Sequence, residues 1–139
     1  MSIQWDDSLI LGIEEIDNQH QSIVGHFSKL SEAAQSGAGK ELIEEIAFFL
    51  IDYAQLHFAT EDRYMVEYGY PRIDEQRREH EEFTRDAGEF KRRIEQEGAS
   101  REVAIAVSGK LVRWIIHHIR NHDREMVSFI KERMAVKGS

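Results

Sequence analysis

The chain has 139 residues, of which 41% are hydrophobic and 32% charged, and it carries a formal net charge of -8. Its length suits one domain with a single core, and an acidic balance without a basic stripe argues against nucleic acid as a partner. The absence of cysteine excludes disulfides and thiolate metal sites, while a single proline among many strong helix formers favours an all-helical fold.

The first sixteen residues predict an extended arm. The opening MSIQWDDSLI has neither a positively charged segment nor a long apolar run, so we expect no signal peptide. No apolar run in the chain is long enough to span a bilayer, so we expect a cytoplasmic protein without a membrane partner. Apolar side chains are expected to anchor this arm to the domain: Trp5, Leu9, Leu11, Ile13 and Ile16.

Two long helices are predicted next. Asp17 is a good N-cap for the first, about 18–36, which the sequence SGAG ends. The second, about 40–67, ends at YGYP. Its apolar residues recur in steps of three and four, and the same stripe continues into His57 and Glu61. An imidazole and a carboxylate are therefore predicted to face the core.

Two further long helices complete the predicted fold. Pro71 lies near the start of a third, about 72–96, and Ser100 can cap a fourth, about 101–120. A short last helix, about 123–135, is expected to follow. Because short connections join the long helices, we predict that the whole chain forms one all-α domain, an antiparallel up-down-up-down four-helix bundle.

Polar residues lie on the predicted core faces at one level of this bundle. Counting 1.5 Å per residue from the connecting turns places them all roughly 27–35 Å from the same end. Asp123 can reach that level from the end of the fourth helix. The other members of this set are His20, His57, Glu61, Gln76, His80 and His118.

Imidazoles and carboxylates gathered in an apolar core would be costly if they were left uncompensated, and a metal resolves that cost. A lone His-x-x-x-Glu pair is more often a hydrogen-bonded or surface pair. Here four helices each contribute a ligand-type residue at one height, and bridging carboxylates with terminal imidazoles suit a pair of iron ions. His118 and His122 are four residues apart, so the spacing alone leaves His122 as an alternative to Asp123.

Other residues are expected to stay outside the site. His26 does not share a helical face with His20 and is predicted to be exposed, and His117 is predicted to lie beside the site or on the surface. Ferritin-like Glu-x-x-His pairs, the zincin His-Glu-x-x-His motif, a glycine-rich phosphate loop and a Ser/His/Asp grouping are all missing from the sequence. Three methionines are expected to fill the core or its edge: Met65, Met126 and Met134.

Several segments resemble those of the bacterial hemerythrins, and together they span almost the whole chain. They are Trp5 followed by LGIEEIDNQH, then HFATE, then YP followed by EHEEF, and finally WIIHHIRNHD. In that family a non-haem di-iron centre inside a four-helix bundle binds O2 reversibly. The resemblance therefore implies a single hemerythrin-like domain over residues 1–139 that holds two iron ions with a solvent-derived oxo or hydroxo bridge.

The resemblance also implies roles for individual residues. It makes Glu61 and Asp123 the bridging carboxylates and favours Asp123 over His122. The terminal ligands that it implies are His20, His57, His80 and His118.

One position departs from the family pattern. The family usually has five histidines, and the missing one belongs four residues before His80, where this chain has Gln76. An amide is a weaker donor to iron than imidazole, so Gln76 is expected to ligate weakly, to hydrogen-bond to a water on the iron, or to leave a position open. In the family the missing histidine belongs to the iron that does not receive O2, so its loss would create a second open position.

Reversible O2 binding for storage, delivery or sensing is the leading functional hypothesis, and it is not an enzymatic one. The alternatives are a di-iron enzyme that handles peroxide or NO, with the replacement at Gln76 favouring weak oxidase or peroxidase activity, and a structural bundle whose site is silent. The expected partners are O2 and small anions such as azide; the protein is expected to be a monomer, and sensing would need a separate signalling partner. The residues expected to wall an O2 pocket are Ile23, Phe58, Trp114 and Ile115.

Overall fold

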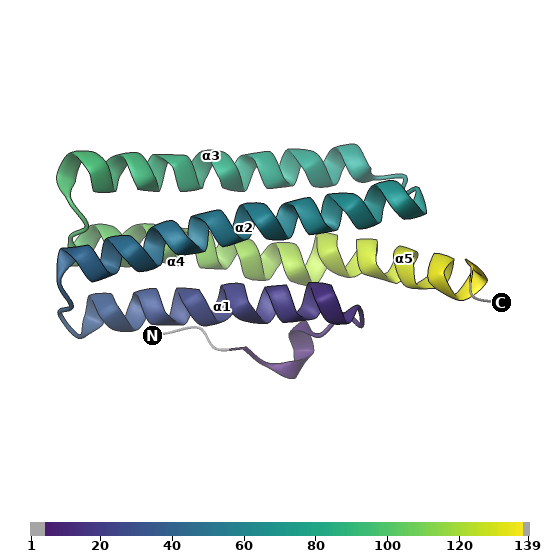
Figure 1. Cartoon of the computed structure of the whole chain (residues 1–139), viewed down its shortest axis with the longest axis horizontal. Helices are drawn as coiled ribbons and strands as arrows, with labels where there is room; N and C mark the ends of the chain where they lie inside the picture. The colour runs from purple at the N-terminus through teal and green to yellow at the C-terminus, as the bar shows by residue number, and fades with distance from the viewer. Residues whose placement is uncertain (1–4, 138–139) are drawn as a thin grey trace.

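A computed structural model describes residues 5–137 of the chain, and within that range it contains helices and no strands (Figure 1). The predicted all-α class is therefore confirmed. A short 3-10 helix precedes five α-helices, and a π-helical segment joins the last two. In chain order the elements are η1 Asp7–Leu9, α1 Glu14–Gln35, α2 Lys40–Tyr68, α3 Ile73–Glu97, α4 Arg101–His118, η2 Ile119–Asp123 and α5 Arg124–Lys137.

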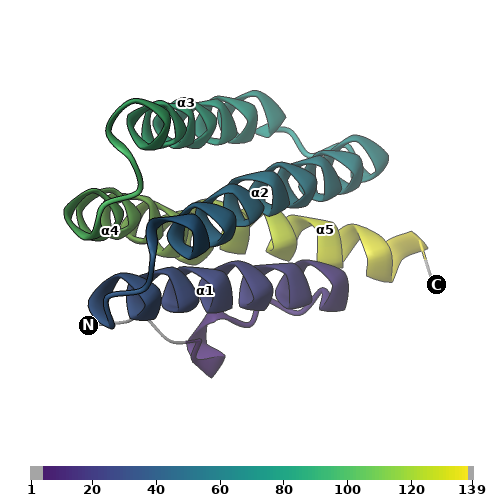
Figure 2. The same ribbon diagram turned by 60° about the vertical axis from the view of Figure 1, so that its left-hand side comes forward.

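The four long helices pack as an antiparallel bundle. Helix α1 contacts α2 and α4, and α3 contacts the same two helices, so each long helix has two long neighbours. Figures 1 and 2 show successive helices running in opposite directions and α5 continuing along the line of α4. No helix in the described part of the chain is long and apolar enough to cross a membrane.

The start of α1 differs from the prediction. The helix begins at Glu14, and Asp17 lies in its first turn instead of capping it. The Asp17 carboxylate accepts hydrogen bonds from the backbone N–H groups of Leu11 at 2.8 Å and Gly12 at 3.0 Å. Asp17 therefore provides the hydrogen-bond acceptor for backbone N–H groups of the loop before the helix, because its carboxylate reaches back beyond the first turn.

The N-terminal arm lies along the outside of α1 and is only partly extended, because it contains η1 (Figure 1). Arg124 in α5 donates a hydrogen bond of 2.7 Å to the carbonyl oxygen of Ser8 and so ties the arm to the bundle. The expected anchors do pack inward: Leu9, Ile13 and Ile16 are buried, and Trp5 and Leu11 are partly buried against the core.

Local sequence explains where the other helices begin and end. Gly69 ends α2 in the left-handed conformation, with φ at 66°, which glycine adopts without strain. Ser100 caps α4 as predicted, because its hydroxyl accepts a hydrogen bond from the backbone N–H of Val103 at 3.2 Å.

The fourth and fifth helices are joined without interruption, because the chain passes from α4 to α5 through η2 without leaving helical conformation. In a regular α-helix each step of four residues drifts by about 40° around the axis, and a π-helical turn absorbs that drift. Buried side chains can therefore recur every four residues along one continuous face: Leu111, Ile115, Ile119, Asp123 and Val127.

The buried polar residues lie between two apolar clusters. Along α1, His20 falls between Ile16 of the smaller cluster and Ile23 of the larger one. Along α2, Glu61 falls between Phe58 of the larger cluster and Met65 of the smaller. The bundle therefore seals this polar level with apolar side chains at both ends.

Candidate metal centre

Buried side chains from α1, α2, α3 and α4, with Asp123 from η2, meet at the level that the sequence predicts. Each is at most 7% exposed. They form two groups in which imidazole nitrogens and carboxylate oxygens lie within 4.8 Å of one another. The first donor group is His20, His57, Glu61 and Asp123, and the second donor group is Glu61, His80, His118 and Asp123.

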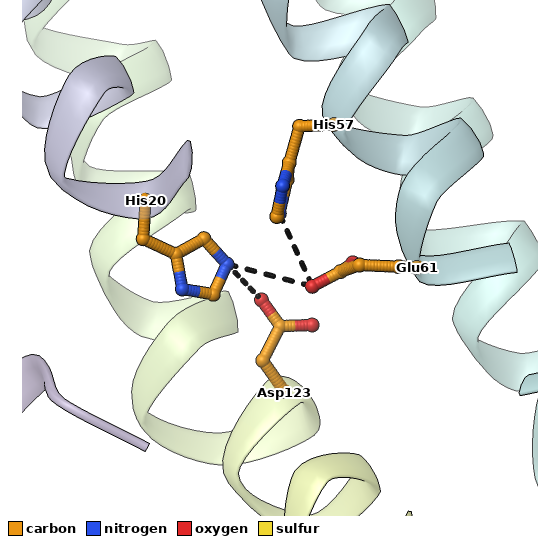
Figure 3. A group of neighbouring side chains, drawn as sticks. All are labelled: His20, His57, Glu61 and Asp123. Atoms are coloured by element: carbon orange, nitrogen blue, oxygen red, sulfur yellow. Dashed lines mark ion pairs between the residues drawn. The ribbon is translucent and has the colours of Figure 1, made fainter. Parts of the chain in front are cut away.

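Figure 3 shows the first donor group, in which two imidazoles face two carboxylates. His20 Nε2 lies 3.4 Å from Glu61 Oε2 and 3.1 Å from Asp123 Oδ2. His57 Nε2 lies 3.1 Å from the same oxygen of Glu61. Three elements that are distant in sequence therefore direct their ligand-type atoms at one point.

The second donor group uses the remaining oxygens of the same two carboxylates. His80 Nε2 lies 2.9 Å from Glu61 Oε1, and His118 Nε2 lies 3.1 Å from Asp123 Oδ1. Glu61 and Asp123 thus each present one oxygen to the first donor group and the other oxygen to the second. This is the arrangement that two carboxylates need in order to bridge two neighbouring cations.

Most of the converging atoms lack hydrogen-bond partners. Buried atoms without such a partner within the described structure include Nε2 of the four histidines and both carboxylate oxygens of Glu61. Unsatisfied buried polar atoms are costly, and imidazole nitrogens and carboxylate oxygens are the donors that iron accepts. The residues present therefore fit a pair of cations of this kind.

Two imidazoles of the site are held in their charged form by the carboxylates. Burial disfavours the imidazolium of His20, but the nearby carboxylates of Asp123 and Glu61 outweigh burial and raise the pKa of His20 to about 9. Burial likewise opposes the charge of His118, but the nearby Asp123 carboxylate, together with the hydrogen bond that His118 donates to Glu79, raises the pKa of His118 to about 10. A cation must displace these protons in order to bind.

The carboxylates are correspondingly held as anions. Burial opposes ionisation of Glu61, yet the surrounding imidazoles, His57 first among them, bring the pKa of Glu61 well below the ordinary value. Burial and the charge of Glu61 raise the pKa of Asp123. Interactions with His118 and His20 lower it by more, so the net shift of the Asp123 pKa is downward. For His57 burial prevails, and its pKa is lowered.

Two residues that sequence reasoning missed orient the imidazoles from behind. Nδ1 of His57 donates a hydrogen bond of 2.7 Å to Gln19 Oε1, and Gln19 in turn donates to Thr60 Oγ1 at 3.1 Å. Nδ1 of His118 donates to Glu79 Oε1 at 3.4 Å. Such partners fix which ring nitrogen faces a metal. Their one sequence signal is adjacency, because Gln19 precedes His20 and Glu79 precedes His80.

Gln76 faces the site, as predicted, and is 1% exposed. Its Nε2 donates a hydrogen bond of 3.0 Å to Asp123 Oδ1 and lies 3.3 Å from Met126 Sδ. Its carbonyl oxygen is buried and has no hydrogen-bond partner within the described structure. The carboxamide therefore adjoins the second donor group through Asp123.

The remaining histidines lie outside both donor groups. The prediction that His26 is exposed is wrong: its ring is half-buried, donates a 2.7 Å hydrogen bond to the carbonyl of Ser22 and stacks on Phe49. His117 is exposed. His122, the alternative to Asp123, belongs to neither donor group: its Nε2 lies 3.4 Å from Glu79 Oε1, and its Nδ1 lies 3.6 Å from Glu75 Oε1.

Aromatic rings cover the second donor group. Phe58 stacks on His80 with ring centroids 4.1 Å apart, and Trp114 stacks on His118 at 4.6 Å. Ile23, Phe58 and Ile115 are buried, and Trp114 is half-buried. That these four side chains wall an O2 pocket stays a prediction.

Comparison with known proteins gives one family. The family model for the hemerythrin HHE cation binding domain matches residues 11–130. A bacteriohemerythrin of Pseudomonas aeruginosa (strain LESB58) is 36% identical over 131 residues, which cover 94% of this chain and 83% of the relative. A bacteriohemerythrin of Stenotrophomonas maltophilia (strain R551-3) is 32% identical over 127 residues, covering 91% and 80%.

More distant similarities agree with this result. A myohemerythrin of Riftia pachyptila is 24% identical over 119 residues, which cover 86% of each chain. A crystal structure of a leucine-to-phenylalanine mutant protein superposes with a TM-score of 0.80 at 22% identity, covering 94% of this chain and 98% of the other. That similarity supports the four-helix fold alone.

Proposed function

Since this chain belongs to the hemerythrin family, we propose that it binds O2 reversibly at a di-iron centre formed by its two donor groups. The observation that carries this proposal is the sharing of carboxylates. Glu61 and Asp123 each direct one oxygen to the imidazoles of either group, at 2.9 to 3.4 Å. Donors placed in this way can hold two cations side by side.

The protein's part in this function is to hold the iron ions, to orient their ligands and to shield them from water. Bound ferrous ions would supply the electrons that O2 binding requires. His20 and His57 would hold one ion and His80 and His118 the other. Gln19 and Glu79 keep ring nitrogens directed at the centre through hydrogen bonds to Nδ1.

The apolar clusters on both sides of the centre support binding without turnover. They exclude bulk water, and water carries the protons that would assist loss of reduced oxygen. Ile23, Phe58 and Ile115 belong to the larger cluster. We therefore propose an O2-binding protein and not an enzyme, with these side chains limiting access to the ions.

The test combines metal content with a visible spectrum. Purified protein should contain about two irons per chain, and anaerobic reduction followed by air should produce a visible band that disappears when O2 is removed. Azide should compete for the same position. Rapid bleaching with turnover of peroxide or NO would contradict binding in favour of enzymatic chemistry. A protein without iron would indicate a silent bundle.

A further inference from the structure

Gln76 distinguishes two donor groups that have the same number of imidazoles and carboxylates. Each group has two imidazoles and shares the same two carboxylates. Gln76 lies one helical turn before His80, and its Nε2 is 3.0 Å from Asp123 Oδ1. That same oxygen is 3.1 Å from His118 Nε2. The carboxamide therefore adds a neutral group to the second donor group.

The free end of this carboxamide is an oxygen donor. Gln76 Oε1 is buried without a hydrogen-bond partner in residues 5–137, which is costly unless another group compensates it. A carboxamide carries its oxygen and nitrogen at equivalent positions, so a half-turn about the terminal C–C bond exchanges them. Gln76 can thus satisfy Asp123 with its N–H group or present a carbonyl oxygen at the same point.

Donor chemistry then differs between the two groups. Imidazole suits iron, whereas carboxylate and carbonyl oxygens suit harder divalent cations such as Mn²⁺. With Gln76 included, the second donor group offers three kinds of side chain and a larger share of oxygen than the first. A site of this composition discriminates less strongly against Mn²⁺ than one built with a further imidazole.

We propose that Gln76 makes the second donor group a mixed nitrogen-oxygen site that accepts Mn²⁺, so that this chain can hold a manganese ion beside an iron ion. The inference rests on the proposed function only in requiring that both donor groups bind cations. It adds a metal preference that follows from one side chain of this sequence. The partner cation in the first donor group would remain iron, because that group lacks the carboxamide.

Competition between the two metals tests the proposal. Metal-free full-length protein is mixed anaerobically with equal amounts of Fe²⁺ and Mn²⁺, freed of unbound metal and assayed for both elements, and bound Mn²⁺ is followed by electron paramagnetic resonance. The parent should retain Mn²⁺ in a measurable minority of chains, because Fe²⁺ still binds a nitrogen-oxygen site more tightly than Mn²⁺ does. Gln76→His should lower the Mn-to-Fe ratio roughly tenfold, since a changed ligand shell alters metal affinity by about 10–100-fold.

Two further variants separate the effect of the Gln76 carbonyl oxygen from the effect of side-chain size. Gln76→Met keeps a neutral side chain of similar length without a carbonyl oxygen, and it should lose Mn²⁺ as well. Gln55→Met is the matched control, because Gln55 is exposed on α2 and donates a 2.8 Å hydrogen bond to Thr84 Oγ1, outside both donor groups. It should retain the parent's metal ratio. Circular dichroism checks that each variant folds. If Gln76→Met does not fold, the comparison of Mn-to-Fe ratios between the parent and Gln76→His decides the test.

The outcomes separate this inference from the proposed function. Equal Mn-to-Fe ratios in the parent and Gln76→His, or exclusion of Mn²⁺ by the parent, would overturn the inference even if the all-iron protein binds O2 reversibly. Retention of Mn²⁺ that depends on Gln76, in a protein whose all-iron form shows no reversible response to O2, would support the inference and defeat the proposed function. A chain that retains neither metal would overturn both.

Discussion

Glu61 and Asp123 are the residues on which both halves of the centre depend. Each is at most 1% exposed and faces imidazoles from two donor groups. A terminal imidazole serves one cation, whereas a bridging carboxylate offsets charge on two. The consequences of losing either carboxylate should therefore exceed those of losing any other single ligand.

Replacing Glu61 by Ala should reduce iron content at both positions, with an affinity loss of at least about 10–100-fold. Asp123→Ala should behave in the same way. Iron per chain, measured after purification under identical conditions, checks this expectation. Glu45→Ala is the matched control, because Glu45 is exposed on the same helix, and His26→Ala controls for removal of an imidazole outside the site. Equal iron in Glu61→Ala and Glu45→Ala would refute the assignment.

Metal uptake should depend on pH through His20 and His118. Their pKa values are raised to about 9 and about 10, so both rings hold protons at neutral pH that an entering cation must displace. Affinity should therefore fall as pH is lowered from 9 to 6, by about tenfold per pH unit for each displaced proton. Chelator competition at several pH values measures the slope. An affinity that does not change over this range would show that neither ring is protonated without metal.

At the scale of the helices, most boundaries could be predicted because local chemistry sets them. Gly69 ends α2 because glycine, without a side chain, adopts the left-handed conformation, and Ser100 begins α4 because its hydroxyl caps the first turn. The start of α1 could not be predicted, since Asp17 can cap a helix or satisfy a preceding loop and only packing of the arm decides. The π-helical segment was also missed, because a five-residue spacing between His118 and Asp123 has no helical period of its own.

The ligand-type residues themselves were predictable for a different reason. Helical periodicity placed His57, Glu61 and Gln76 on inward faces, and equal distances from the turns placed them at one level. The orienting hydrogen bonds of Gln19 and Glu79 depend on side-chain directions across helices, which periodicity does not contain.

The cap of α4 should contribute stability without touching the metal centre. Ser100→Ala removes the acceptor for the backbone N–H of Val103 and should cost about 1 kcal/mol. Thermal unfolding should show a lowered midpoint with unchanged iron per chain. Ser128→Ala, at an exposed position inside α5, is the matched control and should show no loss. A loss of iron in Ser100→Ala would mean that the two ends of α4 are coupled.

At the scale of the whole molecule, the centre makes stability depend on metal. Buried charges weaken the metal-free bundle, and cations that bind only the folded chain stabilise it. Metal at about 100 times its dissociation constant adds about 2.7 kcal/mol. For a chain of this size that gain raises the unfolding midpoint by roughly 5–10 °C.

Thermal unfolding with and without a chelator measures this difference. The parent should lose the gain when metal is removed, whereas Glu61→Ala should show little response because it binds little metal. The same chelator effect in both proteins would locate the stabilising metal outside the donor groups.

The π-helical segment η2 also has a consequence for how the sequence can change among relatives. A π-helical turn adds one residue to an α-helix and leaves the helix on either side in phase. A single insertion can therefore create such a turn, and a single deletion can remove it, without rebuilding the buried face of α5. Alignments of relatives should tolerate a one-residue gap between the positions of His118 and Asp123. The spacing of that pair then records which lineages carry the inserted residue.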